Sequence, residues 1–175
     1  MVITLKGGDK KEYASPVSCK QIAADISERL ARAAVAAKVD GKLVDLAHVV
    51  ESDAEVEIVT LKDKEGLDVY RHTTAHVLAQ AVKAIFPTSK LAIGPTIDNG
   101  FYYDIDFQTP ITQEDLSKIE AEMKKIIKSN LPVERFTLPR NDAIKLMTKF
   151  SEKYKVALIK DLPEGEEISF YKQGA

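Results

Sequence analysis

The first sixty residues place short β-rich runs around a single helix, and this order limits the fold of the segment. Gly7-Gly8-Asp9 and Asp40-Gly41 each separate two neighbouring runs, which indicates hairpin turns. The runs that favour strands are residues 1–6, 11–14, 35–39, 42–46 and 55–61. Two strands, a helix and then further strands predict a β-grasp, or ubiquitin-like, fold.

The helix of this segment is predicted to begin at Ser18. Gln21 stands three places later, which is the spacing of a capping box, in which side chains and backbone N–H groups at a helix start bond one another. Ile22, Ile26 and Leu30 follow at helical spacing. We therefore expect one continuous helix that buries these three residues.

A charged stretch that ends in glycine, residues 62–66 (KDKEG), separates this segment from the rest of the chain. The 175 residues allow two small domains, each with an apolar core. We predict an α+β protein with a first domain at residues 1–61, a linker at residues 62–66 and a second domain at residues 67–175.

The second segment opens on a predicted helix, residues 68–86, that carries two of the three histidines. His72 and His76 are four positions apart, so their imidazoles project from one face, one turn apart. Imidazole can donate a hydrogen bond, accept one or bind a metal near neutral pH. Gln80 and Lys83 continue this polar stripe. The predicted buried face is Thr73, Val77, Leu78, Ala81 and Ile85.

Residues 91–106 (LAIGPTIDNGFYYDID) place glycine, proline and asparagine between β-favouring residues. One interpretation is a loop that admits a polar ligand, with Tyr102 or Tyr103 as a stacking platform or hydroxyl donor. The alternative is a pair of turns that leads into a core strand. The residues themselves leave both open.

The remaining residues predict helices and strands in turn. Thr112 is expected to cap a helix, with Asp115 as the third helical residue. Another helix is expected to begin at Asn141 or Asp142. The predicted strands are residues 133–138, 155–159 and 168–172. Lys155 would then open a strand, where a lysine is most often a solvated end residue.

The histidine pair alone is a weak signal, and a structural or surface role is its alternative interpretation. No glutamate gives the H-E-x-x-H spacing of zinc proteases, and a zinc site would need further ligands. Cys19 and His48 both lie in the first segment and are poor candidates. We therefore predict no metal site.

Composition narrows the class of protein. The formal charge of −2 gives no general attraction to nucleic acid, so any RNA contact must rest on a local surface. A single cysteine excludes a disulfide framework and fits a reducing compartment. Neither a leader nor a run long enough to span a bilayer is recognised, so we expect a cytoplasmic protein without a membrane partner.

The combination of motifs is far more specific than its parts. A β-grasp segment is followed by G-L-x-V-Y-R-H-T-T-A-H-x-L-A-x-A-V and then by I-G-P-x-I-D-N-G-F-Y-Y-D-I-D. This combination resembles the N-terminal half of bacterial threonyl-tRNA synthetases. V-D-G-K-L-V-D-L, T-Q-E-D and Y-K-V-A-L-I extend the resemblance along the chain. It implies a TGS domain followed by an α+β editing domain of the kind also found in alanyl-tRNA synthetases.

In that family the editing domain hydrolyses serine wrongly attached to threonine tRNA. Serine lacks one methyl of threonine, and one methylene in a pocket gives only about 10- to 200-fold discrimination. A second, hydrolytic site therefore makes physical sense. The residues that the resemblance implies are catalytic His72, His76 and Lys155 and substrate-binding Gly94, Asp98 and Tyr103.

The partner that the resemblance implies is the acceptor end of tRNA(Thr) carrying serine. It implies no cofactor for this stretch, although the whole synthetases use ATP, magnesium and zinc and form homodimers through a catalytic domain. The family's editing pocket also uses a C-x-x-x-H element beyond the position where this chain ends. We therefore expect an incomplete editing pocket. The resemblance does not extend to the family's catalytic core, which 175 residues cannot contain in addition, so we expect no tRNA charging.

Two other functions stay open. A non-catalytic TGS-containing module could bind tRNA or another protein, and a free-standing zinc-dependent deacylase is a weaker third possibility. Loss of hydrolysis on replacement of His72, with tRNA binding unchanged, would favour the enzyme.

Overall fold

The computed structural model describes residues 1–174, and its internal contacts divide the chain into two units. Unit 1 is Met1–Arg71 and unit 2 is His72–Ala175. The division falls within one helix, α3 (Lys64–Ile85), which begins four residues before the predicted start. Gly66 lies in the first turn of this helix. Only glycine fits there, because a Cβ would stand 1.9 Å from the Thr60 carbonyl oxygen. This glycine serves a close backbone approach inside a helix.

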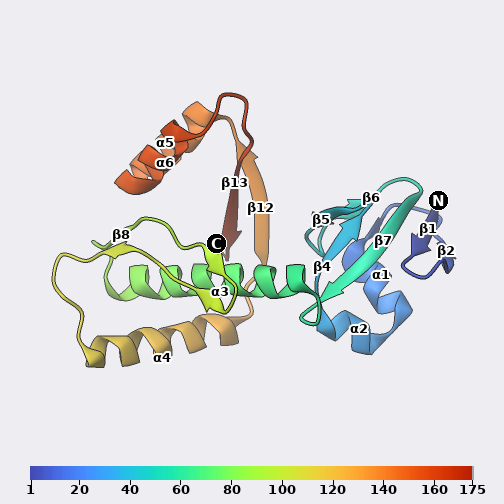
Figure 1. The fold of residues 1–175 in the computed structure, drawn as a ribbon, viewed down its shortest axis with the longest axis horizontal. Helices are drawn as coiled ribbons and strands as arrows, with labels where there is room; N and C mark the ends of the chain where they lie inside the picture. Colours follow the sequence, from blue (N-terminus) through green and yellow to red (C-terminus); the bar gives the residue numbers. More distant parts are fainter. Residues whose placement is uncertain (175) are drawn as a thin grey trace. The chain divides into compact units, whose positions relative to one another are not determined.

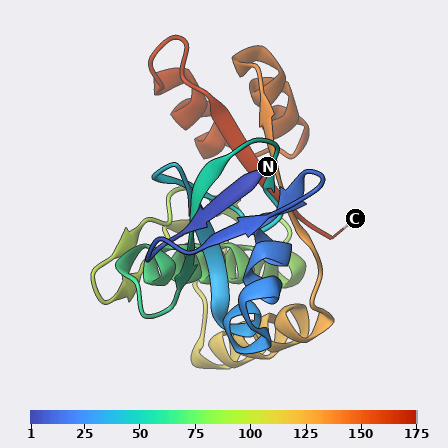
Figure 2. The same ribbon diagram turned by 90° about the vertical axis from the view of Figure 1, so that its right-hand side faces the viewer.

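Unit 1 is built on a five-stranded sheet in the order β2-β1-β7-β4-β5 (Figures 1 and 2). β1 and β7, the first and last of these strands in the sequence, lie side by side and are parallel. The other strand pairs of this sheet are antiparallel. The strands are β1 (Val2–Leu5), β2 (Lys10–Glu12), β4 (Ala34–Val39), β5 (Lys42–Val44) and β7 (Ala54–Thr60), with a separate pair β3 (Val17–Ser18) and β6 (Val49–Val50). The β-grasp prediction is confirmed.

The prediction of one continuous helix in unit 1 is wrong. The chain forms α1 (Cys19–Ile26) and α2 (Glu28–Ala33), and Ser27 between them is extended. The Ser27 hydroxyl accepts a hydrogen bond from the Leu30 N–H at 3.1 Å, so it caps the second helix. Serine favours such caps over helix interiors, and the apolar spacing alone did not reveal this break.

The start of α1 follows only half of the predicted pattern. The Ser18 hydroxyl accepts from the Gln21 N–H at 3.2 Å, as expected for a helix cap. The Gln21 amide instead donates to Asp25 at 2.7 Å and does not return to the helix start. The cap is confirmed, and the reciprocal bond of a capping box is not formed.

One apolar cluster fills unit 1 between the sheet and α1. Ile22 is fully buried in it, and burial raises the pKa of the Cys19 thiol beside it. Cys19 therefore acts as a small apolar filler here. The buried members are Ile3, Val17, Cys19, Ile22, Ala37, Val50 and Val56.

Unit 2 contains an antiparallel arm, a helix against α3, and a two-stranded ribbon with two further helices (Figure 1). In the arm, residues 90–106, β8 pairs with β11 and β9 with β10; in the ribbon, β12 pairs with β13 over six residues. The elements are β8 (Lys90–Leu91), β9 (Thr96–Ile97), β10 (Gly100–Phe101), β11 (Ile105–Asp106), α4 (Gln113–Ser129), β12 (Val133–Leu138), α5 (Arg140–Lys149), α6 (Lys153–Asp161) and β13 (Ile168–Gln173).

Two separate apolar clusters stabilise unit 2. One joins α3 to α4 through Val77, Ala81, Val82, Ile119 and Ile126. The other joins α5 and α6 to the ribbon through Ala143, Ile159 and Ile168. Val77 and Ala81 were predicted as buried, whereas Thr73, predicted with them, is exposed. Ala75 and Ala79 are buried in its place, because small residues let α3 be covered on more than one side.

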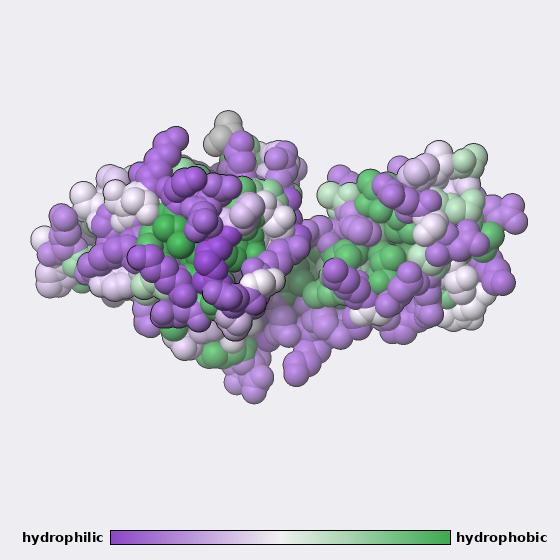
Figure 3. Space-filling model, turned by 90° about the horizontal axis from the view of Figure 1, so that it is seen from above, coloured by the Kyte–Doolittle hydropathy of each residue, from purple (hydrophilic) through white to green (hydrophobic). Residues whose placement is uncertain are grey.

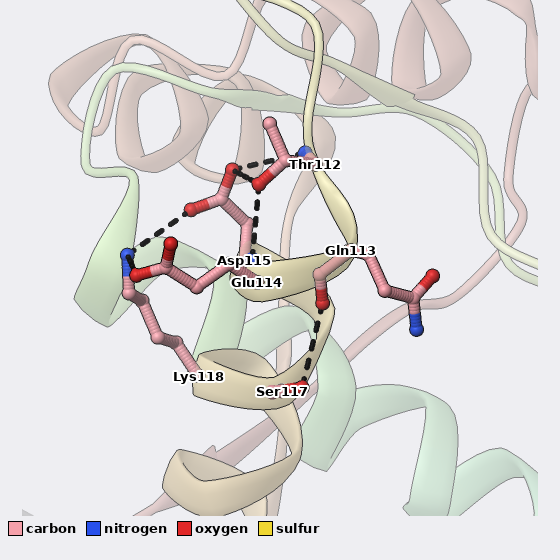
Figure 4. A network of polar contacts seen from close by, with 6 residues as sticks. All are labelled: Thr112, Gln113, Glu114, Asp115, Ser117 and Lys118. Atoms are coloured by element: carbon pink, nitrogen blue, oxygen red, sulfur yellow. Dashed lines mark hydrogen bonds and ion pairs between the residues drawn. The ribbon is translucent and has the colours of Figure 1, made fainter.

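The predicted start of α4 is confirmed in detail (Figure 4). The Thr112 hydroxyl accepts from the Asp115 N–H, and the Asp115 carboxylate accepts from the Thr112 N–H at 3.0 Å. This is a complete capping box, which satisfies two N–H groups that would otherwise lack partners. Lys118, one turn later, pairs with both Glu114 and Asp115.

The predicted strand at residues 155–159 is wrong, because this segment lies in α6. A short apolar run such as V-A-L-I fits a buried strand and a packed helix equally well. The helix is closed at its C-terminal end by Arg140, which also begins α5 one residue before the predicted range. The Arg140 guanidinium donates to the carbonyl oxygens of Ile159, Lys160, Leu162 and Pro163 at 2.5–3.2 Å.

Apolar residues emerge between hydrophilic ones on the face of each unit drawn in Figure 3. Several large apolar side chains of the ribbon and of α4 are exposed, among them Val133, Phe136 and Ile127. The rings of Phe136 and Phe170 stack across the ribbon, with their centroids 5.4 Å apart. Within residues 1–174 no helix is long and apolar enough to cross a membrane.

Candidate functional site

The two histidines of α3 stack on each other in unit 2. Their ring centroids are 4.6 Å apart and the ring planes differ by 18°. The helix sets this arrangement directly, because residues four apart lie on one face. Tyr171 of β13 lies on the same side, with its ring centroid 6.1 Å from that of His76.

His76 is held in its neutral form over most of the pH range. Its pKa falls from 6.5 to about 4, first because neighbouring side chains remove water from the ring and then because His72 and Lys155 add positive charge nearby. The residue as a whole is still exposed. A neutral imidazole can accept a proton.

The arm brings a tyrosine to this site. A Cβ at Gly94 would stand 2.5 Å from Cδ2 of Tyr103, so only glycine leaves room for the tyrosine ring. Burial raises the pKa of Tyr103, and the charge of Glu152 raises it further. Its hydroxyl therefore stays protonated and can donate a hydrogen bond at neutral pH.

Lys155 reaches the same site from α6. Its Nζ lies 5.7 Å from the centroid of the Tyr103 ring, within the range of a cation–π contact. Burial lowers the pKa of Lys155, and Glu152 opposes this shift. Its charge also contributes to the lowered pKa of His76. Three elements that are distant in sequence therefore meet here.

Five of the six residues assigned from the sequence come together: His72, His76, Gly94, Tyr103 and Lys155. Asp98 does not join them. It lies exposed in the turn between β9 and β10, and no hydrogen bond or ion pair connects it to the others within residues 1–174. The roles of all six residues stay predictions.

Two polar residues near this site were not found from the sequence. Glu152 is buried and acts on both Lys155 and Tyr103, yet in the charged run S-E-K-Y-K it looks like a surface residue. Gln80, assigned only to the polar stripe, has a buried Oε1 that no donor reaches within the described chain. Only the packing of distant elements distinguishes either residue.

The arrangement supplies groups for hydrolysis. The neutral His76 can accept a proton from water, and the Lys155 ammonium can stabilise a developing negative charge. As for metals, the described residues hold no group of three or more histidine, cysteine, aspartate and glutamate side chains placed to bind an ion.

Comparison with known proteins gives two results. Residues 1–60 match the TGS domain family. A threonine–tRNA ligase of Acetivibrio thermocellus is 56% identical over 172 residues, and that of Clostridioides difficile is 55% identical over 172 residues. The corresponding protein of Marinobacter nauticus is 49% identical over 173 residues. These alignments cover 98–99% of this chain and 27% of each relative, so the chain spans about a quarter of their length.

Proposed function

We propose that this chain, which corresponds to the N-terminal region of threonine–tRNA ligases and carries a TGS domain, contributes through its second unit the residues of a site that hydrolyses mischarged Ser-tRNA(Thr). The observation that carries the proposal is the meeting of His72, His76, Tyr103 and Lys155 on one side of α3. In this proposal, residues 67–175 form an editing domain of the threonyl- and alanyl-tRNA synthetase type. In the whole protein, this hydrolysis would accompany threonine ligation.

The proposed chemistry is attack of water on the ester that joins serine to the terminal ribose. His76, neutral at physiological pH, takes a proton from the water as the new C–O bond forms. Lys155 stabilises the negative charge on the carbonyl oxygen. The bond to the ribose oxygen then breaks and that oxygen receives the proton. An aminoacyl ester is already activated, so positioning contributes much of the rate.

The proposed partner is the acceptor end of tRNA(Thr), and the TGS domain is proposed to help hold it. Tyr103, packed on Gly94, offers a ring face for the terminal adenine and a hydroxyl for hydrogen bonding. Asp98 at the tip of the arm is proposed to contact the substrate once the acceptor end is bound. The overall charge of −2 means that local contacts must supply this binding.

The test is deacylation of Ser-tRNA(Thr) by this chain and by a version extended at its C-terminus along the sequence of the relatives. Thr-tRNA(Thr) is the control substrate for both. Hydrolysis of the serine ester alone, by either version, supports the proposal; if only the extended version acts, the pocket needs residues beyond Ala175. If neither acts and both bind tRNA, a non-catalytic binding module replaces the editing function.

His76→Ala is expected to slow deacylation by about 100-fold or more, because it removes the proton acceptor. The matched control is His48→Ala, which changes an exposed histidine of unit 1. Rates are compared under single-turnover conditions, and tRNA affinity is measured separately. Equal rates for the two variants would show that His76 takes no part in the reaction.

A further inference from the structure

Glu152 is a buried carboxylate beside the proposed hydrolytic site. Its side chain is 8% exposed, and Ser89 is the other buried polar residue among residues 1–174. A buried carboxylate is unfavourable unless it is paired and hydrogen-bonded. The partners of Glu152 therefore indicate what keeps it in this place.

The Glu152 carboxylate bonds to two other segments of unit 2. One oxygen, Oε1, lies 2.8 Å from Nζ of Lys83 on α3, and Oε2 accepts from the Leu91 N–H in the arm at 3.1 Å. Lys83 also donates to the carbonyl oxygens of Pro87 and Ser89 at 3.0 and 2.8 Å, which fixes its ammonium group. Glu152 thus joins the start of α6 to both α3 and the arm.

The local backbone is unfavourable in two respects where it presents this side chain. Ser151 has φ 57°, a left-handed conformation that non-glycine residues rarely adopt. Glu152 occupies the N-cap of α6, yet its side chain makes no capping hydrogen bond. Such features persist where the surrounding structure requires them, and they cluster at functional sites.

The site residues lie next to this junction. Lys155 follows Glu152 by one helical turn, and Tyr103 belongs to the arm that the Leu91 N–H attaches to Glu152. We propose that Glu152, paired with Lys83, is a positioning residue that holds Lys155 and Tyr103 in place against His72 and His76. This proposal rests on the hydrolytic function proposed above.

The chain offers a matched control in Asp106. Its carboxylate joins the same two elements, the arm and α6, through Lys153 at 3.1 Å and the Tyr154 hydroxyl at 2.9 Å. Asp106 is exposed, whereas Glu152 is buried. If attachment of α6 to the arm were all that matters, loss of either carboxylate would have similar effects.

The test compares Glu152→Gln with Asp106→Asn. Titration followed by nuclear magnetic resonance of labelled Lys155 and Tyr103 is the first measurement, because it needs no activity. Loss of the Glu152 charge is expected to lower the pKa of both groups, since that charge raises both. Asp106→Asn is expected to move neither. Deacylation is expected to slow by about 10- to 100-fold in Glu152→Gln and to be unchanged in Asp106→Asn. The upper figure is the loss of rate that a misplacement of a catalytic group by about 1 Å can cause.

Circular dichroism establishes whether each variant folds. The second variant is Lys83→Met. It keeps the carboxylate but removes its ion-pair partner, so it is expected to slow deacylation in the same direction. The double variant is expected to act no more slowly than the slower single variant, because the two residues act as one unit. Rates that multiply would overturn the pairing.

The two proposals fail in different ways. If the parent hydrolyses Ser-tRNA(Thr) and a folded Glu152→Gln does so at the same rate, the positioning role is overturned. If the titrations shift but the parent chain and its extended version hydrolyse no Ser-tRNA(Thr), the electrostatic coupling of Glu152 to Lys155 and Tyr103 stands and the hydrolytic function fails. Equal loss of activity in Glu152→Gln and Asp106→Asn would reduce Glu152 to a general tie between the arm and α6.

Discussion

Unit 1 buries one apolar cluster beneath a five-stranded sheet, whereas unit 2 divides its apolar residues between two smaller clusters. Polar contacts connect the elements of unit 2: the ion pair of Lys83 with Glu152, and the site formed by His76, Tyr103 and Lys155. The difference shows how one chain can combine a scaffold with a chemical site. Most titratable side chains of unit 1 lie in solvent. In unit 2, burial shifts the pKa values of His76, Tyr103 and Lys155.

Ile22→Ala probes the scaffold side of this comparison and should have the largest effect on stability. Ile22 is fully buried, and loss of its side chain leaves a cavity, so the free energy of unfolding of unit 1 should fall by about 2–5 kcal/mol. Urea unfolding measures this, with Leu43→Ala, at an exposed position, as the control. If the resonances of Tyr103 and His76 shift as well, the site is not separate from the unit 1 core.

Gly94→Ala probes the site side. The new methyl group would collide with the Tyr103 ring, so unit 2 should lose about 1–3 kcal/mol of stability and Tyr103 should move. Thermal unfolding and the ring resonances of Tyr103 give the two measurements. Ile97→Ala, an exposed change in the same arm, is the control for stability. Normal stability with an unmoved ring would contradict the close packing of glycine on tyrosine.

Thr112→Ala removes a cap in unit 2 that lies outside the site. Loss of the capping box should lower the stability of unit 2 by about 1 kcal/mol and leave the pKa of His76 unchanged. Ser117→Ala, on the same helix, changes a hydroxyl with a single 3.4 Å hydrogen bond and serves as control. A shift in the His76 titration would show that α4 helps to form the site.

The last comparison concerns the pH dependence that His76 gives to the stability of unit 2. Its pKa is about 4 when folded and 6.5 ordinarily, so between these values the unfolded chain binds more protons. Stability should therefore rise with pH from about 4 to about 6.5, and the contribution is lost as pH falls through this window. His76→Ala should flatten this part of the profile in urea unfolding. The same slope in both proteins would place the titration elsewhere.

Local signals in the sequence predicted much of the fold. Turn pairs and alternating strands gave the β-grasp, and the Thr112 spacing gave a capping box that the structure contains. The errors arose where local patterns are ambiguous. Residues 155–159 suit a strand or a helix, and Ser27 breaks a helix whose apolar spacing continues through it.

The residues of the candidate site also fall into those that the sequence indicated and those that it did not. The histidine pair follows from helical spacing, whereas Gly94, Tyr103 and Lys155 were implied by the resemblance to threonyl-tRNA synthetases. Glu152 could not be found, because its burial depends on Lys83 and Leu91, which are remote in sequence. Whether a charged residue lies in solvent or inside a unit is decided by its tertiary partners.

The attachment of α6 at both ends has a mechanical consequence. A nine-residue helix is marginal by itself in water, but here Glu152 fixes one end and Arg140 binds the carbonyl oxygens at the other. A short helix that is bound at both ends moves as one rigid body, so a displacement of Glu152 or Arg140 shifts the whole helix. The place of Lys155 is then set by two residues that never need to touch a substrate.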